Sequence, residues 1–395
     1  MRSSSPEDRS DRWFTGVLLA VVLAALLTLV ARDVMNGDQV LRLDSTVYRN
    51  AINQMLAGGS LYGYQMVAFG QVLPFNYPPF AVLVLLPWAV MPVGWSQALW
   101  MLVQLGSAAI MVWSVVRRMS PRWLPSGWRR LGVFIVAVGI YLSSAAAMQS
   151  VLLGQVSLVV SAMVVVDLLL IPARYRGLLT GVAAGIKLFP MVFLPYFLVS
   201  RQWRAAAGVA AGFVVSSAVA WAILPQESLR YWTVELFNTG RVGGTDWLRN
   251  KSLLGLVTHF HLGGSQGQAW WLVAVLVLAA IALWRAARHH RRGEDVAAML
   301  VTGALAGLMS PISWPHHLAI VALVPIYLML LERRVWFAVG VAAVVVFNYY
   351  SPAMWPEGPP RGWQELAQYL VTVAMSVIAV MGLPRSAAAA ARVVE

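Results

Sequence analysis

Long apolar runs recur along the whole chain and constrain its fold more than any other feature. Most of them approach the roughly 20 residues that an α-helix needs to cross a bilayer. In lipid a helix satisfies its own backbone hydrogen bonds, so we predict an all-α polytopic membrane protein with about 11–13 transmembrane helices. The runs are 14–31, 79–92, 97–116, 131–148, 155–171, 177–199, 205–224, 269–286, 296–309, 316–331, 335–350 and 363–383. We expect residues 1–395 to form one membrane domain, in which the loops 32–76 and 225–268 carry surface helices.

The composition agrees with a chain that has lipid as its solvent. Apolar residues make up 59% of the 395 positions and charged residues 11%, whereas a soluble domain carries about 25% charged residues. The run 14–31 is longer than the apolar core of about 7–15 residues in a secretory signal, and no small-residue cleavage site follows it. We therefore predict a retained first helix with a cytoplasmic N-terminus. Cysteine is absent, which excludes disulfides and thiolate metal sites.

The net charge of +13 is concentrated in short connectors between the apolar runs. This distribution is typical of cytoplasmic loops that face anionic lipid, and it argues against nucleic-acid binding. The basic connectors that we expect in the cytoplasm are 117–130, 172–176, 200–204, 285–295 and 332–334. The connectors that we expect on the outer side are 149–154, 225–268, 310–315 and 351–362, together with the loop 32–76. One question stays open, because 77–116 must cross an odd number of times yet contains two apolar runs.

Two local patterns predict interrupted or surface helices. The segment "STVYRNAINQMLAGG" (45–59) has apolar residues at mixed three- and four-residue spacings, which favours a surface helix that Gly58 and Gly59 end. Basic residues flank 177–199 on both sides, and Pro190 opens the helix ladder inside it. We therefore predict two short helices that meet at "IKLFP", with Lys187 at their outer or mid-membrane apex.

On this topology the unusual polar residues gather on the outer side. Titratable groups at membrane depth are costly and usually functional, so we predict one pocket at the outer leaflet. The motifs are Asp44 in the first loop, "FNYPPF" (75–80), "QSVLLGQVS" (149–157), "IKLFP" with Lys187, "RNKSLLG" (249–255) and "MSPISWPHH" (309–317), which carries His316 and His317.

Each motif also has an ordinary structural interpretation. Asp44 can be a solvated loop acid or a helix N-cap, because Thr46 and Val47 follow it. Lys187 can extend its ammonium group to a lipid headgroup. The two histidines can bond backbone carbonyls at the interface, and "NKS" (250–252) can be plain loop polarity. A transporter of lipid-linked sugars is a further alternative, because such proteins often contain broken helices. We find no matching interrupted segment in a second half of the chain.

Taken in order, these motifs resemble glycosyltransferase family 87, a branch of the membrane-embedded GT-C glycosyltransferases. The resemblance runs from about residue 40 to 335 and is carried by Asp44 with "VYRNA" and "LAGGSLYGY", then "FNYPPF", "GQVS", "GIKLFP", "NKSLLG" and "SPISWPHH". It implies the GT-C fold and no metal or other cofactor. It also implies a polyprenyl-phosphate-mannose donor in the outer leaflet of the plasma membrane. The acceptor would be a mannosylated glycolipid such as a phosphatidylinositol mannoside. The alternative within the family is a cell-wall arabinofuranosyltransferase that uses polyprenyl-phosphate-arabinose.

The resemblance also implies roles for individual residues. Asp44 corresponds to the catalytic base, and His316 or His317 to an acceptor-side catalytic histidine. Transfer with inversion needs one base to deprotonate the attacking hydroxyl, and cations to hold the departing phosphate. The candidate cations are Lys187, Lys251 and Arg249. The candidates for contact with the sugar or the acceptor are Tyr62, Tyr77, Gln155, Asn250 and Trp314.

Overall fold

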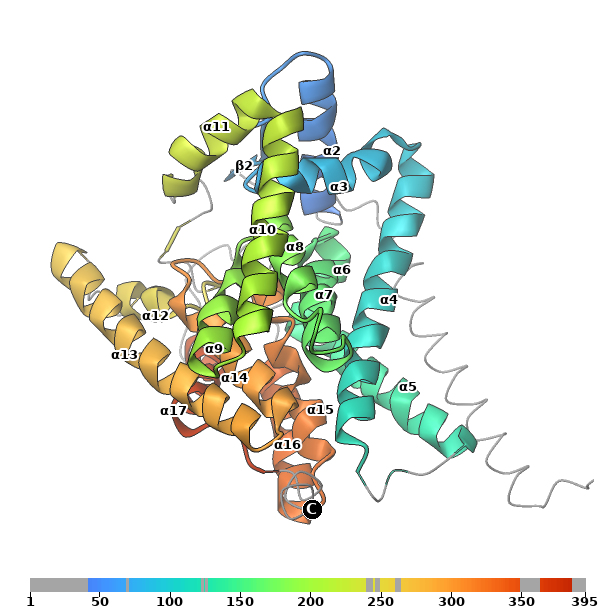
Figure 1. The fold of residues 1–395 in the computed structure, drawn as a ribbon, viewed down its shortest axis with the longest axis vertical. Helices are drawn as coiled ribbons and strands as arrows, with labels where there is room; N and C mark the ends of the chain where they lie inside the picture. The colour runs from blue at the N-terminus through green and yellow to red at the C-terminus, as the bar shows by residue number, and fades with distance from the viewer. Residues whose placement is uncertain are drawn as a thin grey trace, which may run out of the picture.

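The computed structural model describes residues 42–68, 71–121, 124, 127–238, 244–245, 249–259, 264–348 and 363–385. The predicted first helix (14–31) and the predicted outer loop 351–362 lie outside these residues. Within them the chain is built from helices, as predicted, with one small hairpin (Figure 1).

The first half of the chain runs from the surface helix to the broken segment. Its elements are α2 (Leu43–Leu56), β1 (Gln65–Ala68), β2 (Gln71–Pro74), α3 (Pro79–Val90), α4 (Val93–Met119), α5 (Gly127–Ser143), α6 (Ala145–Leu153), α7 (Ser157–Leu169), α8 (Leu178–Ile186), the 3-10 helix η1 (Phe189–Val192) and α9 (Phe193–Val199).

The second half contains two long helices and several short ones. Its elements are α10 (Trp203–Ile223), α11 (Pro225–Thr233), η2 (Glu235–Phe237), α12 (Leu253–His259), α13 (Gly264–Arg291), α14 (Asp295–Met309), η4 (Pro315–Leu318), η5 (Val321–Leu323), α15 (Val324–Met329), α16 (Arg334–Asn348) and α17 (Trp363–Met381).

Several described helices have the length and composition of membrane spans. Three are long and apolar enough to cross a bilayer: Val93–Met119, Trp203–Ile223 and Gly267–Arg291. A fourth span is possible in the pair Arg130–Ser143 and Ala145–Leu153, which bends by 72° at Ser144. Shorter apolar helices fill the space between them. The protein is therefore a polytopic membrane protein, and the total of about 11–13 crossings stays a prediction.

The open question about 77–116 has a simple structural answer. Helix α3 has 12 residues, which gives it a length of about 18 Å, too short to cross the hydrocarbon core. Helix α4 has 27 residues and runs from the end that holds α2 and α3 to the opposite end (Figure 1). In this segment α4 alone has the length of a span, and α2 lies at the end of the bundle opposite Arg117 and Arg118.

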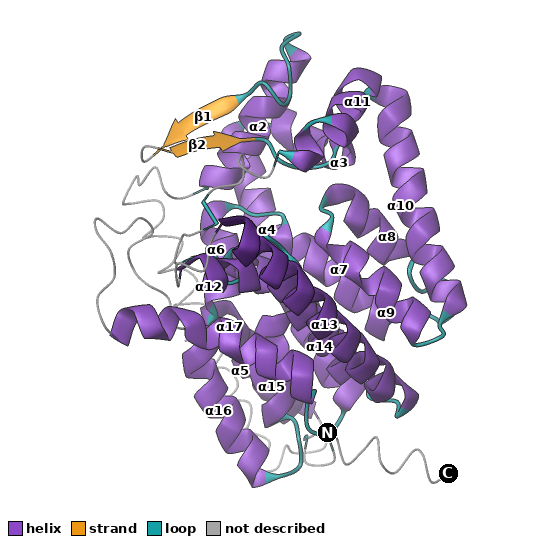
Figure 2. Cartoon of the chain, turned by 90° about the vertical axis from the view of Figure 1, so that its left-hand side faces the viewer, coloured by secondary structure: helices purple, strands orange, loops and turns teal. Residues whose placement is uncertain are grey.

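The end that holds α2 also carries α3, α11 and a hairpin that the sequence did not predict. Strands β1 and β2 pair antiparallel, with Gln65 opposite Pro74, and project from one side of this end (Figure 2). Val67 in β1 is 72% exposed, so the hairpin contributes little to the core. The helix predicted in 45–59 is confirmed as α2, and Gly58 follows it at φ +86°; its position on the membrane surface stays a prediction.

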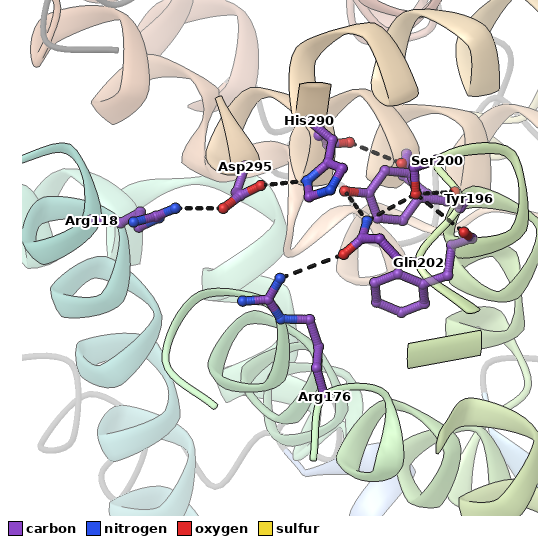
Figure 3. A network of polar contacts seen from close by, with 10 residues as sticks. Arg118, Arg176, Tyr196, Ser200, Gln202, His290 and Asp295 are labelled. Atoms are coloured by element: carbon purple, nitrogen blue, oxygen red, sulfur yellow. Dashed lines mark hydrogen bonds and ion pairs between the residues drawn. The ribbon is translucent and has the colours of Figure 1, made fainter. Parts of the chain in front are cut away.

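The basic connectors meet at the opposite end in a polar network (Figure 3). Arg118 at the end of α4 pairs with Asp295 at 2.5 Å, and Asp295 lies 2.7 Å from Nδ1 of His290. Nearby, the Gln202 amide accepts from Arg176 at 3.5 Å and donates to the Ser200 hydroxyl at 2.8 Å. Residues of four predicted cytoplasmic connectors therefore lie together, at the end of the molecule opposite α2.

The broken segment 177–199 is confirmed, and a close helix contact fixes its first half. Lys187 is in extended conformation between α8 and η1. Helix α8 packs backbone to backbone on α10, because a Cβ at Gly181 would lie 2.2 Å from the carbonyl oxygen of Val209. Gly177 and Gly185 make equally close contacts, to Ala205 and Ser216. The position at which Lys187 leaves α8 is therefore set by this glycine contact.

Candidate active site

Helix α2 is fixed at its first turn to the end of α6 and to the turn at Gly154 that follows it. It begins after Arg42, which has a positive φ of 69° and gives no side-chain cap. The N–H of Arg42 donates to the carbonyl of Leu152 at 2.6 Å. Gly154 has φ +68°, and a Cβ there would lie 2.5 Å from the Ser45 hydroxyl oxygen. Asp44 is thus in the first helical turn, and its interpretation as an N-cap is wrong.

Asp44 is the centre of a hydrogen-bond network that joins three distant motifs. Gln155 Nε2 donates to Asp44 Oδ2 at 2.6 Å. The carbonyl oxygen of Gln155 accepts from the hydroxyls of Tyr48 and Tyr77, at 2.9 Å each. Tyr48 lies one helical turn after Asp44, on the same face of α2. The motifs "VYRNA", "FNYPPF" and "GQVS" therefore converge, as the sequence predicted.

Lys187 completes this cluster from the break between α8 and η1. Its Nζ donates to the Ser157 hydroxyl at 2.8 Å and lies 5.2 Å from the ring centroid of Tyr77. Gln155 and Ser157 are two positions apart at the start of α7. Their side chains bind the carboxylate of Asp44 and the ammonium group of Lys187, respectively. The two charges are close enough to act on each other.

The surroundings tune the acidity of Asp44. Burial raises the pKa of its carboxyl group from the ordinary value of 3.8 to about 6, against the opposing effects of the Gln155 hydrogen bond and the Lys187 charge. A carboxylate with this pKa is ionised at neutral pH yet is a stronger base than an exposed aspartate. That combination suits a general base.

The two histidines come from a loop that is tied to the "NKS" segment. The four hydrogen-bonding positions of the Asn250 amide are occupied: Nδ2 donates to the carbonyls of Thr245 and Pro311, and Oδ1 accepts from the N–H groups of Ser252 and Ser313. The Asn250 amide therefore has no hydrogen-bonding position left for the sugar contact that the sequence predicted. The Lys251 N–H donates to the Ser313 carbonyl at 2.7 Å, so Asn250 and its neighbour shape the histidine loop.

His316 and His317 occupy different environments. His316 is buried, and its Nδ1 lies 3.2 Å from Oε1 of Gln149 in α6. His317 is half-buried, and its Nδ1 accepts from the Trp314 N–H at 3.3 Å. In the neutral ring the other nitrogen of His317 is then an N–H donor. The loop lies beside the Asp44 cluster, because η4 packs against α6 and α7, and the charge of Lys187 acts on both rings.

Exposure separates side chains that can touch a substrate from those that support them. Asp44, Tyr77, Lys187, Trp314 and His317 are half-buried. By contrast Tyr62 is 1% exposed, donates its hydroxyl to the Tyr77 carbonyl at 2.8 Å and stacks on Tyr231. We therefore interpret Tyr62 as a support for Tyr77 in place of the predicted sugar contact. Lys251 is 5% exposed and Arg249, whose charge acts on it, is half-buried; their roles stay predictions.

Sequence reasoning missed three members of the site. Tyr48, Ser157 and Gln149 all bond to predicted residues, yet none was singled out. For Tyr48 a signal existed, since a residue four positions after Asp44 shares its helix face. Ser157 and Gln149 belong to the quoted motif "QSVLLGQVS", but which of its polar residues turn inward depends on the bend at Ser144 and the turn at Gly154.

A bundle of apolar helices that encloses a carboxylate, a lysine and two histidines at one end defines a membrane-embedded enzyme. Comparison with known families makes this specific: the model of glycosyltransferase family 87 matches residues 75–311, and the chain belongs to that family. The predicted resemblance is thus confirmed, and it favours the enzyme over the transporter.

Relatives of known activity extend the likeness over most of the chain. A polyprenol-phosphate-mannose-dependent alpha-(1-2)-phosphatidylinositol mannoside mannosyltransferase of Mycolicibacterium smegmatis is 32% identical over 387 residues, covering 87% of this chain and 84% of the relative. The protein of the same description from Mycobacterium tuberculosis is 30% identical over 371 residues, with 88% and 86% covered. An alpha-(1->3)-arabinofuranosyltransferase of Corynebacterium glutamicum is 25% identical over 362 residues, with 88% and 82% covered.

Proposed function

We propose that the protein transfers mannose from polyprenol-phosphate-mannose to a phosphatidylinositol mannoside or a similar glycolipid. The support comes from the mannosyltransferases, which are more similar to this chain than the arabinofuranosyltransferase is. The observation that carries the chemistry is the pairing of Asp44 with Lys187 across Gln155 and Ser157.

The reaction needs one base and no general acid. The acceptor hydroxyl oxygen attacks C1 of the mannose while the bond from C1 to the phosphate oxygen breaks, which inverts the anomeric centre. Asp44 takes the hydroxyl proton, and the bonding electrons leave with the polyprenyl phosphate. That leaving group is already a stable anion, so it requires charge stabilisation and no protonation.

Lys187 is the cation that we assign to the donor phosphate. Its ammonium group is half-buried, acts on Asp44 and is bonded to the first residue of α7. The amino-terminal end of a helix carries a partial positive charge, so α7 adds to the attraction for an anion. We prefer Lys187 to Lys251 and Arg249, which remain candidates for a second phosphate contact.

We assign the contact with the acceptor to the histidine loop. His317 is half-buried and offers an N–H, whereas His316 is buried against Gln149. We therefore assign His317 to the acceptor and His316 to the support of the loop. Tyr77 and Trp314 supply aromatic surface for a sugar face.

We also propose that the α2 end faces the extracytoplasmic side of the plasma membrane. The basic connectors gather at the other end, and loops with Arg and Lys usually stay in the cytoplasm. The whole chain then acts as one membrane domain, with 32–76 and 225–268 as outer loops and the polyprenyl tail among the helices.

The test is mannosyl transfer by the purified protein in detergent, with polyprenyl-phosphate-mannose and a phosphatidylinositol mannoside as substrates. Asp44→Asn removes the base, and we expect kcat to fall by about 10²–10⁴-fold. Glu332→Gln, an exposed acid in a basic connector, is the control and should keep wild-type turnover. Near-normal turnover in Asp44→Asn would disprove the assignment of the base. Polyprenyl-phosphate-arabinose replaces the donor in a parallel assay, and preferred transfer of arabinose would refute the choice of mannose.

Lys187→Ala tests the phosphate contact separately. Loss of a charge-assisted hydrogen bond costs about 1.5–3 kcal/mol, so we expect kcat/KM for the donor to fall roughly 10- to 150-fold. KM for the acceptor should change little, because Lys187 is assigned to the other substrate. Unchanged donor kinetics would remove Lys187 from the phosphate site.

A further inference from the structure

Gln155 differs from the substrate-facing residues in its exposure. Its side chain is 4% exposed, while Asp44, Tyr77 and Lys187 are half-buried. The sequence predicted Gln155 as a sugar or acceptor contact. A buried amide whose hydrogen bonds go to other site residues is better placed to control those residues than to bind a sugar.

The Gln155 amide has partners on both sides, and the carboxylate of Asp44, which can only accept, determines its orientation. On one side the hydroxyls of Tyr48 and Tyr77 lie 2.9 Å from its carbonyl oxygen and 2.8 Å from each other. On the other side its Nε2 lies 2.6 Å from Asp44 Oδ2. Reversal of the amide would place its carbonyl oxygen against the carboxylate, where two acceptors and no hydrogen would meet.

We propose that Gln155 is a positioning residue whose amide, locked by Tyr48 and Tyr77, holds Oδ2 of Asp44 so that Oδ1 receives the acceptor proton. This inference rests on the proposed function, in which Asp44 is the general base. The hydrogen bond to Oδ2 stays a donor bond whether Asp44 is ionised or has taken the proton on Oδ1. The carboxyl group can therefore change charge during the reaction while the network stays in place.

A positioning role for Gln155 predicts an effect on the pH dependence of activity that a sugar-binding role does not. Removal of a donor to the ionised carboxylate favours the protonated form, so enzyme activity should be lost at higher pH than in the wild type. Glutamate at position 155 should act more strongly, because two carboxylate oxygens at this distance compete for one proton. A residue that only binds the acceptor would change KM for the acceptor and leave the pH dependence unaltered.

The experiment measures kcat/KM against pH for Gln155→Glu, Gln155→Leu and Tyr48→Phe. A hydrogen bond to a charged group corresponds to a shift of about one to two pH units. We expect the acid limb to move upward by that amount in Gln155→Leu, further in Gln155→Glu and less in Tyr48→Phe. Changes in acceptor KM should stay within about threefold.

Tyr327→Phe is the matched control, since it removes a buried tyrosine hydroxyl that donates to the Pro384 carbonyl at 2.6 Å, away from the site. Its acid limb should match the wild type. If the Gln155 variants fail to fold, the double variant Tyr48→Phe/Tyr77→Phe decides the matter, because it removes both hydroxyls from the amide and leaves Gln155 and Asp44 in place. An unshifted acid limb with a raised acceptor KM would overturn the inference.

Asp44→Asn, assayed in parallel, separates this inference from the proposed function. Full turnover in Asp44→Asn would refute the base itself. An inactive Asp44→Asn combined with a wild-type acid limb in folded Gln155→Glu would refute only the positioning role.

Discussion

The acidic residues described in the structure differ in their exposure and in the groups that bind them. Oδ2 of Asp167, a fully buried side chain in α7, accepts from the N–H groups of Gly177 and Thr180 and from the Thr180 hydroxyl, and so caps the start of α8. Asp295 is paired with Arg118 and His290. Asp44 is half-buried and is held through Oδ2 by Gln155. Among these acids, Asp44 combines a fixed position with access for a substrate.

The acidity of Asp44 predicts how activity depends on pH. Its folded-state pKa is raised to about 6, so the carboxyl group is ionised above that pH and becomes protonated as the pH falls through 6. A protonated base cannot accept the hydroxyl proton. We expect kcat/KM to fall about tenfold per pH unit below 6, because kcat/KM reports the free enzyme. A profile that stays level down to about pH 4 would contradict a base with a raised pKa.

At the scale of elements, the site depends on short helices that are held by close backbone contacts. Helix α8 has nine residues, too few to be stable alone, and its glycines let it approach α10 closely enough for extensive van der Waals contact. The turn at Gly154 likewise lets α2 pack closely against it, because only glycine fits both the positive φ and the contact with Ser45. Asp44 and Lys187 are thus positioned by close contacts at glycines in neighbouring segments.

Gly181→Ala tests this dependence at a distance from the chemistry. The added Cβ would lie 2.2 Å from the Val209 carbonyl oxygen, so α8 must move away from α10. We expect a loss of about 1–3 kcal/mol in the free energy of unfolding and a raised donor KM, because Lys187 moves with α8. Gly106→Ala in α4 is the control, since a Cβ there meets open space within 4 Å. Its stability should match or exceed that of the wild type, and equal effects of the two variants would contradict the role of the α8–α10 contact.

At the scale of the whole molecule, charge and polarity are separated between the two ends. The network of Arg118, Asp295 and His290 lies where the basic connectors meet (Figure 3), and α2, which carries Asp44, lies at the other end (Figure 1). A lipid-linked donor needs its phosphate and sugar at the membrane surface and its tail among helices. A site toward one end of a helical bundle suits both requirements.

The absence of cysteine makes the proposed orientation directly measurable. Val67→Cys on the exposed hairpin should react with a membrane-impermeant maleimide added to intact cells. Arg174→Cys, exposed in a basic connector, should react only after the membrane is permeabilised. The opposite labelling pattern would put Asp44 on the cytoplasmic side and remove the extracytoplasmic active site.

The sequence by itself determined that the chain is a membrane protein and which motifs contain the candidate site residues. Apolar run length predicted a helical membrane protein, arginine placement predicted which connectors lie together, and the ordered motifs predicted the family. These properties follow from composition and spacing, because a helix in lipid satisfies its own backbone whatever its neighbours are. The break at Lys187 was also predictable, since Pro190 and the flanking arginines act locally.

Only the tertiary structure decided which polar side chains face the site and which support it. The sequence predicted Tyr62, Gln155 and Asn250 as substrate contacts. In the structure each is buried and hydrogen-bonded to other parts of the protein. The small hairpin and the shortness of α3 also required the structure. Hydrogen bonds between residues about a hundred positions apart, such as Gln155 with Asp44, depend on how helices pack, and helix packing is set by contacts that no local spacing encodes.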